Sequence, residues 1–286
     1  MLASGSRIRD YEVWGRLGGG GMSDVWLARH VVLAVPVILK TLRPEIGSSA
    51  EDRLRRLVNE ARLMARISCP YVVRALDVGT HEEVPYIVQE YVDGIDLNGL
   101  PLWFVCDAAA QIALGLQAAH QYGVLHRDLK PSNLFGSADG SVKLGDFGVA
   151  VPTQVSEKNL AGSAGTLRFM APEALRREPL DRRADVYGLG ATVYDLRYGS
   201  PPFARANVVL DPGAVVRFPA PQSAEEAYFQ HVLSRMLEKD RNRRYPDLTE
   251  PRRALAQLAQ STRRPLWWSR PRAGSLTLGG VRVSTE

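Results

Sequence analysis

Cysteine is scarce in this sequence. Only Cys69 and Cys106 occur among the 286 residues, and their separation matches no metal-binding pair. This argues against a disulfide framework and favours reduced thiols. Long apolar runs are missing too: the longest, residues 31–39 (VVLAVPVIL), is too short to span a bilayer and contains Pro36. The N-terminal residues hold no run suited to a signal peptide, so we expect a cytoplasmic chain without a membrane span.

Lysine is scarce as well, although the formal net charge is +5 at pH 7. The arginines that supply most of the positive charge are mixed with acidic residues in stretches such as EDRLRR and EKDRNRR. They lack the interleaved aromatic residues that are typical of nucleic-acid surfaces. Solvated helix faces are the better interpretation, and we expect no nucleic-acid partner. The few lysines are candidates for specific roles: Lys40, Lys130, Lys143, Lys158 and Lys239.

The first third of the chain is predicted to be rich in strands and the remainder mainly helical. Residues 11–40 alternate apolar and polar side chains around a glycine cluster, which indicates two or three strands. Residues 51–67 place their apolar side chains on one helical face. Further elements are expected as strands at 72–78 and 86–91, a hairpin at 133–145, and helices from about 102 and at 184–198, 225–238 and 250–260. This order indicates an α+β chain in two lobes.

The expected lobe boundaries follow from these elements. Residues 8–91 form the predicted small lobe, and residues 92–260 form the large one. Residues 261–286 differ in composition, being rich in Arg, Pro, Gly and Ser. We expect this tail to be loosely ordered or docked through Trp267 and Trp268, and an anchor for a partner or a membrane surface is the alternative.

The strongest chemical signal is HRDLKPSN at residues 126–133, followed by GDFG at residues 145–148. Charged groups held next to apolar segments are costly unless they are paired, metal-bound or functional. Because a hairpin brings its two ends together, Asp128, Asn133 and Asp146 are predicted to converge. Two carboxylates and an amide oxygen suit Mg²⁺, which keeps water and phosphate oxygens in its shell. By itself, Asp146 could instead cap a turn.

In this order the motifs resemble those of the eukaryotic-like (Hanks-type) Ser/Thr protein kinase family, in particular its bacterial members. The resemblance extends over about residues 10–260. It implies a two-lobed α+β protein-kinase-like fold, with an antiparallel sheet and one helix in the small lobe and a mainly helical large lobe. It also implies the use of ATP with Mg²⁺, with Mn²⁺ as an alternative ion, and protein substrates.

The resemblance assigns roles to the residues of these motifs. It implies that Asp128 orients the substrate hydroxyl group and accepts its proton, and that Lys130 contacts the transferred phosphate. Asn133 and Asp146 would bind the metal ions. In GTLRFMAPE, Thr166 matches the threonine that bonds the catalytic aspartate and lysine of Ser/Thr kinases. Positioning and stabilisation of charge are what phosphoryl transfer needs.

A further lysine and glutamate match the same family. Lys40 ends the apolar stretch VILK, and Glu60 follows 20 residues later in the predicted amphipathic helix. An unpaired ammonium group in an apolar strand is costly. The resemblance implies that Lys40 pairs with Glu60 and contacts the α- and β-phosphates of ATP. The alternative, a strand-end lysine whose head reaches water, does not account for the other motifs.

The glycine-rich stretch LGGGGMSDVWLA is similar to the loop that covers the phosphates in this family, although Ser23 stands where the third glycine is usual. Glycine lets backbone N–H groups approach phosphates closely. The resemblance implies that this stretch contributes the following nucleotide-binding residues: Leu17, Gly18, Gly20, Gly21 and Val25.

The segment EVPYIVQEYVDG resembles the strand and hinge that bind adenine. The resemblance implies that Gln89 is the gatekeeper residue beside the adenine pocket. It also implies that Glu90 and Val92 offer backbone contacts to the base and that Asp96 reaches the ribose. Ile38 occupies a position where alanine is usual, and its larger side chain narrows the space above the base.

Other residues are expected to stabilise or regulate the large lobe. Glu173 is predicted to pair with Arg244, and Asp185 to hold the backbone of the catalytic loop. Arg127 offers a cationic partner to a phosphate group on residues 148–172. The candidate phosphorylation sites are Thr153, Ser156 and Ser163.

The leading hypothesis is an active Ser/Thr protein kinase that transfers the γ-phosphate of ATP to protein hydroxyl groups and autophosphorylates its activation segment. A homodimer for phosphorylation in trans is compatible with this activity. The alternative from another class is a pseudokinase scaffold, supported only by Ile38 and Ser23. A small-molecule phosphotransferase is disfavoured by GTLRFMAPE, which serves protein substrates in the kinase family.

Overall fold

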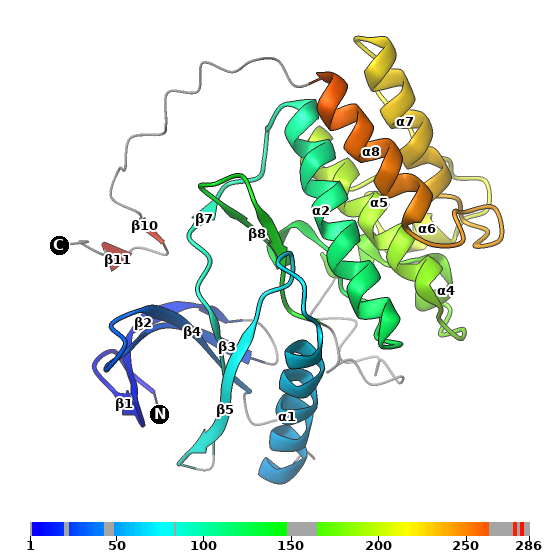
Figure 1. The fold of residues 1–286 in the computed structure, drawn as a ribbon. Coiled ribbons are helices and arrows are strands. Elements are labelled where there is room, and N and C mark those ends of the chain that lie inside the picture. Colours follow the sequence, from blue (N-terminus) through cyan, green and yellow to red (C-terminus); the bar gives the residue numbers. More distant parts are fainter. Residues whose placement is uncertain are drawn as a thin grey trace. The chain divides into compact units, whose positions relative to one another are not determined.

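The computed structural model of the chain describes residues 2–19, 23–42, 49–82, 84–147, 165–262, 277–278 and 281–282. The chain divides into two compact units (Figure 1). The first contains Met1–Arg66 and Val73–Tyr91, and the second contains Ile67–Val72 and Val92–Arg264. Ile67–Val72 therefore belongs to the second unit, although it lies within residues 8–91, the predicted small lobe. The predicted docking of the tail through its two tryptophans lies outside the described residues.

The first unit is built on an antiparallel sheet. Its described strands are β1 (Arg7–Ile8), β2 (Tyr11–Gly19), β3 (Ser23–His30), β4 (Pro36–Leu42), β5 (Ala75–His81) and β6 (Val84–Glu90). They are hydrogen-bonded in the order β1-β2-β3-β4-β6-β5. Successive side chains of a strand point to opposite faces of the sheet. One face carries a buried core that includes Val13, Leu39, Tyr86 and Val88.

One helix of the first unit, α1 (Ala50–Arg66), packs against β5 and β6. Its start is capped by Ser49, whose Oγ accepts the N–H of Asp52 at 3.0 Å. Ala61 and Met64 are buried and lie three residues apart, which is the spacing of one helical face. The helix predicted at residues 51–67 is confirmed.

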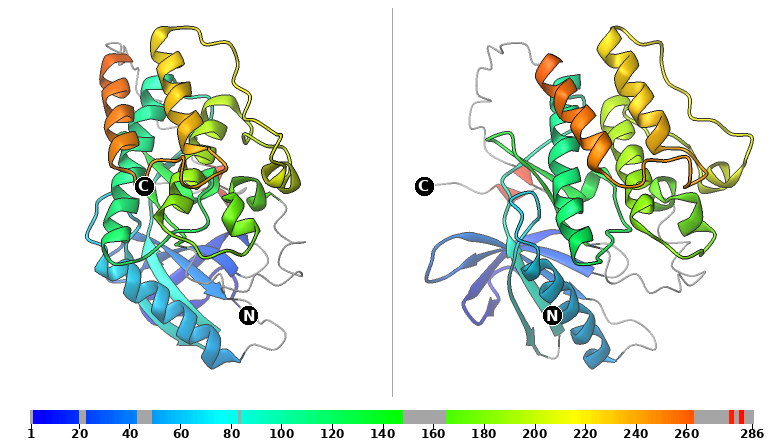
Figure 2. Two further views of the ribbon diagram at one scale, coloured as in Figure 1. Left: turned by 90° about the vertical axis from the view of Figure 1, so that its right-hand side faces the viewer. Right: turned by 45° about the vertical axis from the view of Figure 1, so that its right-hand side comes forward.

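The second unit is mainly helical. Its long helices among the described residues are α2 (Leu102–Gln121), α5 (Arg182–Tyr198), α7 (Ala224–Met236) and α8 (Thr249–Thr262). α2 packs against α5 and α8, and α7 packs against the same two helices (Figure 2). Gly190 of α5 permits the approach to α7, because a Cβ atom at this position would lie 2.9 Å from Cβ of Met236. The helices predicted in this part of the chain are confirmed.

By length and composition alone, α2 could cross a membrane, since it has 20 residues and a mean hydropathy of 1.4. However, 61% of this apolar window is buried inside the structure. Ala109, Ile112 and Leu116 are among the buried side chains, so packing within the second unit accounts for its apolar character. No other helix among the described residues is long and apolar enough.

The second unit also contains a small sheet, whose strand β8 directly follows the segment HRDLKPSN. Its strands, in hydrogen-bonded order, are β7 (Gly94–Ile95), β8 (Leu134–Ser137) and β9 (Val142–Leu144). The turn between β8 and β9 requires Gly140, whose φ is 88°, and Oδ1 of Asp139 accepts the N–H of Ser141 there at 2.8 Å. The hairpin predicted at residues 133–145 is confirmed.

The remaining described elements are short. They are the 3₁₀ turns η1 (Pro131–Asn133) and η2 (Thr166–Phe169), the helices α4 (Pro172–Leu175) and α6 (Ala206–Leu210), and the paired strands β10 (Thr277–Leu278) and β11 (Val281–Arg282).

The strand predicted at residues 72–78 is wrong at its beginning. β5 begins at Ala75 instead, because Val72 forms a bridge with Leu144 of β9. The carbonyl O of Tyr71 also accepts the N–H of Leu144 at 2.9 Å. These contacts hold the segment before β5 in the second unit, and no local sequence pattern indicates such a distant pairing.

Candidate active site

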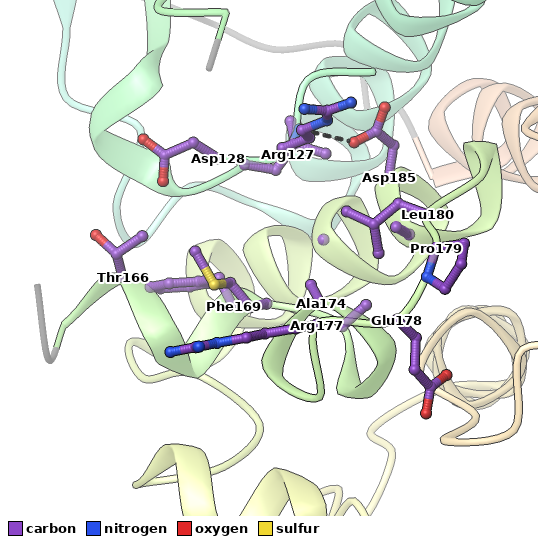
Figure 3. A pocket seen from close by; sticks show the side chains of 15 residues that line it. Arg127, Asp128, Thr166, Phe169, Ala174, Arg177, Glu178, Pro179, Leu180 and Asp185 are labelled. Carbon is purple, nitrogen blue, oxygen red and sulfur yellow. Dashed lines mark hydrogen bonds between the residues drawn. The ribbon is translucent and has the colours of Figure 1, made fainter. Parts of the chain in front are cut away.

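Asp185, in the first turn of α5, holds the backbone of the loop that contains HRDLKPSN. Its Oδ1 accepts the N–H of Arg127 at 3.0 Å (Figure 3), and its Oδ2 accepts the N–H of His126 at 2.9 Å. The φ of Arg127 is 66°, in the left-handed region that L side chains rarely adopt. The two hydrogen bonds therefore stabilise an unfavourable backbone conformation directly before Asp128, and the predicted role of Asp185 is confirmed.

The Asp185 carboxylate is 1% exposed. Burial alone would raise its pKa. The hydrogen bond and electrostatic attraction of His120 and the N–H of Arg127 outweigh burial, so the pKa of Asp185 lies below its ordinary value. The group therefore remains an ionised acceptor for its N–H donors at neutral pH.

His126 connects the loop that contains HRDLKPSN to the residues that follow β9. Its ring is fully buried, with Nε2 2.9 Å from the carbonyl O of Gly145, and its Nδ1 accepts the N–H of Asp128 at 3.3 Å. Because a carbonyl only accepts, Nε2 carries the hydrogen. Burial lowers the pKa of His126, so the ring is a neutral imidazole. It holds the backbone of Asp128 close to Gly145, the residue before Asp146.

Asp128 is held by the side chains of two other motif residues. Lys130 Nζ lies 2.8 Å from Oδ2 of Asp128, and Asn133 Nδ2 donates to Oδ2 at 3.2 Å and to the carbonyl O of Asp128 at 2.8 Å. Lys130 Nζ also donates to Oγ1 of Thr166 at 3.3 Å. The other carboxylate oxygen of Asp128, Oδ1, is buried and has no hydrogen-bond partner among the described residues. One oxygen is thus fixed in place, while the other is a buried acceptor whose hydrogen-bonding capacity is unused among the described residues.

Asn133 and Asp146 are brought near each other by the backbone, since the N–H of Gly145 donates to the carbonyl O of Asn133 at 3.0 Å. The amide nitrogen of Asn133 is used for Asp128, which leaves its amide oxygen for a cation. Among the described residues, no group of three or more His, Cys, Asp or Glu side chains could hold a metal ion. This donor set fits Mg²⁺ that arrives with a phosphate substrate, because such sites use few protein oxygens.

Beside these residues lies a pocket of about 430 Å³ within the second unit. Asp128 and Thr166 stand at one end of it (Figure 3). Its wall is largely apolar and includes Leu129, Phe169, Met170, Ala174, Pro179 and Leu180. The pocket therefore combines apolar side chains with charged ones, which include Asp128, Arg177 and Glu178.

Glu173 and Arg244 form a buried ion pair that stabilises the second unit. Arg244 donates to both carboxylate oxygens of Glu173, at 2.6 and 2.8 Å, and the two side chains are 0% and 4% exposed. The guanidinium group also donates to three backbone carbonyls. All its strong donors are therefore used, as a buried arginine requires, and the predicted pair is confirmed.

In the first unit, the sheet register gathers predicted nucleotide-binding residues on one face. Lys40 of β4 lies opposite Val25 of β3, and Ile38 of β4 lies opposite Gln89 of β6. Ile38 and Lys40 are two residues apart, and cross-strand partners point to the same side, so all four side chains share a face. Nε2 of Gln89 donates to Sδ of Met64 at 3.6 Å, which shows that α1 packs on this face.

The predicted partner of Lys40 lies on that helix, because Glu60 belongs to α1. The side chain of Glu60 lies outside what the structure describes, so the ion pair with Lys40 stays a prediction. Glu90 ends β6, where its N–H donates to the carbonyl O of Arg74 at 3.0 Å and its Oε1 accepts the N–H of Arg74 at 2.9 Å.

The glycine-rich stretch is described in part. Leu17 and Gly18 belong to β2, and Gly18 lies opposite Val25. Gly20 and Gly21 lie outside the described residues, as do all three candidate phosphorylation sites, Thr153, Ser156 and Ser163.

The last two predicted nucleotide contacts, Val92 and Asp96, belong to the second unit. Oδ1 of Asp96 accepts both the backbone N–H and the side-chain amide of Asn98, at 2.9 and 2.8 Å. The structure thus brings together Asp128, Lys130, Asn133 and Thr166 in the second unit and Val25, Ile38, Lys40 and Gln89 in the first.

Two histidines of the second unit, His120 and His126, make contacts that the motifs do not predict. His126 was visible as the first residue of HRDLKPSN, and its neighbours could have indicated a structural role. His120 has no such signal, since it is a lone histidine in an alanine-rich segment. In the structure its Nε2 lies 2.7 Å from Oδ2 of Asp185.

Known proteins are similar to this chain over most of its length. The model of the family described as "Protein kinase domain" matches residues 11–255. The serine/threonine-protein kinase PknB of Mycobacterium tuberculosis strain H37Rv is 34% identical over 277 residues, which are 90% of this chain and 44% of PknB. PknF of the same strain is 36% identical over 223 residues, which are 72% of this chain and 46% of PknF. The chain therefore spans less than half the length of these relatives.

A solved structure of a kinase domain also matches most of this chain. The crystal structure of the M. tuberculosis PknI kinase domain has a TM-score of 0.67 and 29% identity, and the match covers 90% of this chain and 100% of that one.

Proposed function

This chain belongs to the protein kinase domain family, and from that premise we propose that it is a serine/threonine-protein kinase. It transfers the γ-phosphate of ATP, with Mg²⁺ or Mn²⁺, to hydroxyl groups of protein substrates. The observation that carries the proposal is the arrangement around Asp128, where one carboxylate oxygen is held by Lys130 and Asn133 and the other is buried without a partner.

Asp128 orients the acceptor hydroxyl group. Its Oδ1 accepts the hydroxyl hydrogen, while the bonds from Lys130 and Asn133 to Oδ2 keep the carboxylate from rotating. Lys130 lies between Asp128 and Thr166 and places a positive charge where the transferred phosphoryl group develops negative charge. Thr166 in this position supports the assignment to serine and threonine acceptors.

Asn133 and Asp146 would hold the divalent ion that accompanies ATP. When bound, such an ion would supply positive charge that neutralises phosphate charge. The protein contributes the orientation of the two oxygen donors, through the bond from Gly145 to Asn133 and the bond from Asn133 to Asp128.

The residues proposed to contact the nucleotide lie in β2–β4, α1 and β6 and in the segment that follows β6. In the first unit, Lys40 contacts the α- and β-phosphates and pairs with Glu60, the glycine-rich stretch covers the phosphates, and Ile38 and Gln89 border the base. Glu90 and Val92 offer backbone groups to adenine, and Asp96 contacts the ribose. The shared face of Val25, Ile38, Lys40 and Gln89 supports this assignment.

Several finer statements belong to the same proposal. The expected compartment is the cytoplasm, in keeping with Cys69 and Cys106, which are both free thiols. Autophosphorylation of the activation segment, in a homodimer, is the expected route of activation. The intact bonding around Asp128 gives no support to the alternative of a scaffold without catalysis.

The test is phosphate transfer from labelled ATP to a generic basic protein in the presence of Mg²⁺. We expect transfer by the wild-type chain and a loss of about 10²- to 10⁴-fold in Asp128→Asn, which keeps the shape of the side chain but cannot accept the proton. Asp240→Asn, an exposed aspartate of the second unit, is the matched control and should retain the wild-type rate. A wild-type chain that binds ATP but transfers no phosphate would favour the scaffold.

A further inference from the structure

The short helix α4 ends in a left-handed turn. The N–H of Arg177 donates to the carbonyl O of Ala174 at 3.1 Å, and the N–H of Glu178 donates to that of Glu173 at 2.9 Å. This pair of bonds is the Schellman motif, whose left-handed residue is usually glycine. Here that residue is Arg177, with a φ of 59°. An arginine thus stands where glycine would be free of strain, and such an outlier points to a functional side chain.

Arg177 is one of the residues that line the pocket beside Asp128. Figure 3 shows its side chain extended beneath Phe169, with the guanidinium group on the side of the pocket where Thr166 stands. The pocket of about 430 Å³ is roughly 9 Å across if it is spherical, and an extended chain advances about 3.3 Å per residue. A protein segment whose hydroxyl group lies at Asp128 therefore passes Arg177 within about three residues.

Arg177 gives this pocket a positive charge that is not matched within it. The residue is exposed and forms no ion pair with another described residue. The carboxylates that line the same pocket are already engaged: Lys130 binds Asp128, backbone N–H groups bind Asp185, and Glu178 lies 3.8 and 3.9 Å from two other guanidinium groups. The only further charged residue among the described ones in the wall is another arginine. The pocket is therefore complementary to an acidic side chain.

We propose that Arg177 is a specificity-determining residue, which selects protein substrates with a glutamate or aspartate within about three residues of the acceptor hydroxyl group. The planar guanidinium group binds the carboxylate through paired N–H donors. This inference rests on the proposed kinase function for its effect on transfer, whereas recognition of the acidic segment requires no catalysis.

The chain itself contains one such target. Ser156 is followed by Glu157, which is the only acidic residue among residues 148–164. Of the candidate phosphorylation sites, Ser156 alone has an acidic residue within about three positions, so it is the expected site of autophosphorylation.

The test uses serine peptides that differ at one position, which is glutamate, glutamine or lysine, at each of the three positions before and after the acceptor. Wild-type kcat/KM should be about 5- to 20-fold higher with glutamate than with glutamine at the preferred position. Arg177→Gln should remove the preference, Arg177→Lys should keep part of it, and Arg177→Glu should favour lysine instead. Arg176→Gln is the matched control, because Arg176 is exposed as well but does not line this pocket.

A purely structural role would lower the rates with all peptides alike, and it would not exchange one charge preference for the other. Arg177→Gly should also lose the preference, with an unfolding midpoint close to that of wild type, because glycine adopts this turn without strain. The proposal is overturned if the wild type shows no preference for glutamate, if Arg177→Gln or Arg177→Gly retains it, or if Arg176→Gln loses it equally.

Autophosphorylation provides a second test in the chain itself. Glu157→Gln should lower the label on Ser156 by about 5- to 20-fold in the wild-type background and by less than about 2-fold in Arg177→Gln. Equal losses in the two backgrounds would contradict the proposal.

A binding measurement separates this inference from the proposed function. Peptides with alanine at the acceptor position should bind the wild-type chain about 5- to 20-fold more tightly with glutamate than with glutamine, and Arg177→Gln should bind both equally. Equal binding by the wild type contradicts the inference even if the chain is an active kinase. Selective binding by a chain that transfers no phosphate would support the inference and reject the proposed function alone.

Discussion

The catalytic loop of the second unit and the sheet of the first unit position their functional side chains in different ways. In the loop, polar groups hold one another: Asp185 holds the backbone of Arg127, and Lys130 holds Asp128. In the sheet, the register of β3, β4 and β6 places Ile38 and Lys40 on a common face through the backbone ladder. The loop should therefore be sensitive to the loss of single hydrogen bonds, whereas the sheet should keep its geometry when one side chain is replaced.

The first prediction distinguishes an effect on function from an effect on the geometry of the sheet. Lys40→Met should lower kcat/KM by about 10²- to 10³-fold, because it removes a charge proposed to contact the phosphates. The thermal unfolding midpoint should stay close to that of wild type, since the ladder of β4 does not depend on the ammonium group. Lys143→Met, on β9, is the control for loss of a lysine. Extensive unfolding of Lys40→Met would contradict the expectation that the sheet keeps its geometry when one side chain is replaced.

The second prediction concerns the stability of the second unit. Glu173→Gln or Arg244→Met should each lower the free energy of unfolding by about 3–5 kcal/mol, because each leaves a buried partner uncompensated. Urea denaturation gives this value. The double variant Glu173→Leu with Arg244→Met should lose less than the sum of the two, since no buried charge is then left alone. If either single variant lost less than about 1 kcal/mol of its free energy of unfolding, the buried ion pair would be contradicted.

The third prediction is a pH effect on the loop. The pKa of Asp185 is lowered in the folded chain, so its contribution to stability is present above its unfolded pKa of about 3.9 and is lost as the pH falls through the folded value. Asp185→Asn should therefore be less stable than wild type at pH 7, and the difference should shrink as the pH falls below about 4. Urea midpoints between pH 7 and pH 3 measure it. A gap that widens toward acid would show that the pKa is raised instead.

The smallest expected effect concerns α1 of the first unit, where a single hydrogen bond at the start of the helix contributes to stability. Ser49→Ala removes the cap of α1 and should lower the free energy of unfolding by about 1 kcal/mol. Ser49→Asp restores an acceptor and should recover most of it. Phosphate transfer should change little in either variant, and a loss of activity with unchanged stability would mean that the cap acts on the site through α1.

Much of the fold and of the loop could be predicted from the sequence. The spacing of HRDLKPSN and GDFG on either side of a hairpin determines local backbone geometry, so the approach of Asp128, Lys130 and Asn133 follows from nearby residues. The comparisons confirm the resemblance to bacterial Ser/Thr protein kinases and the two-lobed fold class.

The misses have a common physical cause. Val72 pairs with Leu144, and His120 meets Asp185, across separations of 72 and 65 residues. Periodicity and motif spacing describe contacts within one element or one turn, whereas these contacts arise when separate elements pack. Nothing in the sequence around a lone histidine in an alanine-rich helix indicates which carboxylate it will contact.

The central claim is that the residues around Asp128 transfer phosphate to aliphatic protein hydroxyl groups. The most direct measurement compares four peptides that are identical except for one acceptor position, which is serine, threonine, tyrosine or alanine, incubated with labelled ATP and Mg²⁺. The account predicts label on the serine and threonine peptides alone, and its disappearance in Asp128→Asn. Label on the tyrosine peptide only, or undiminished label with Asp128→Asn, would contradict it.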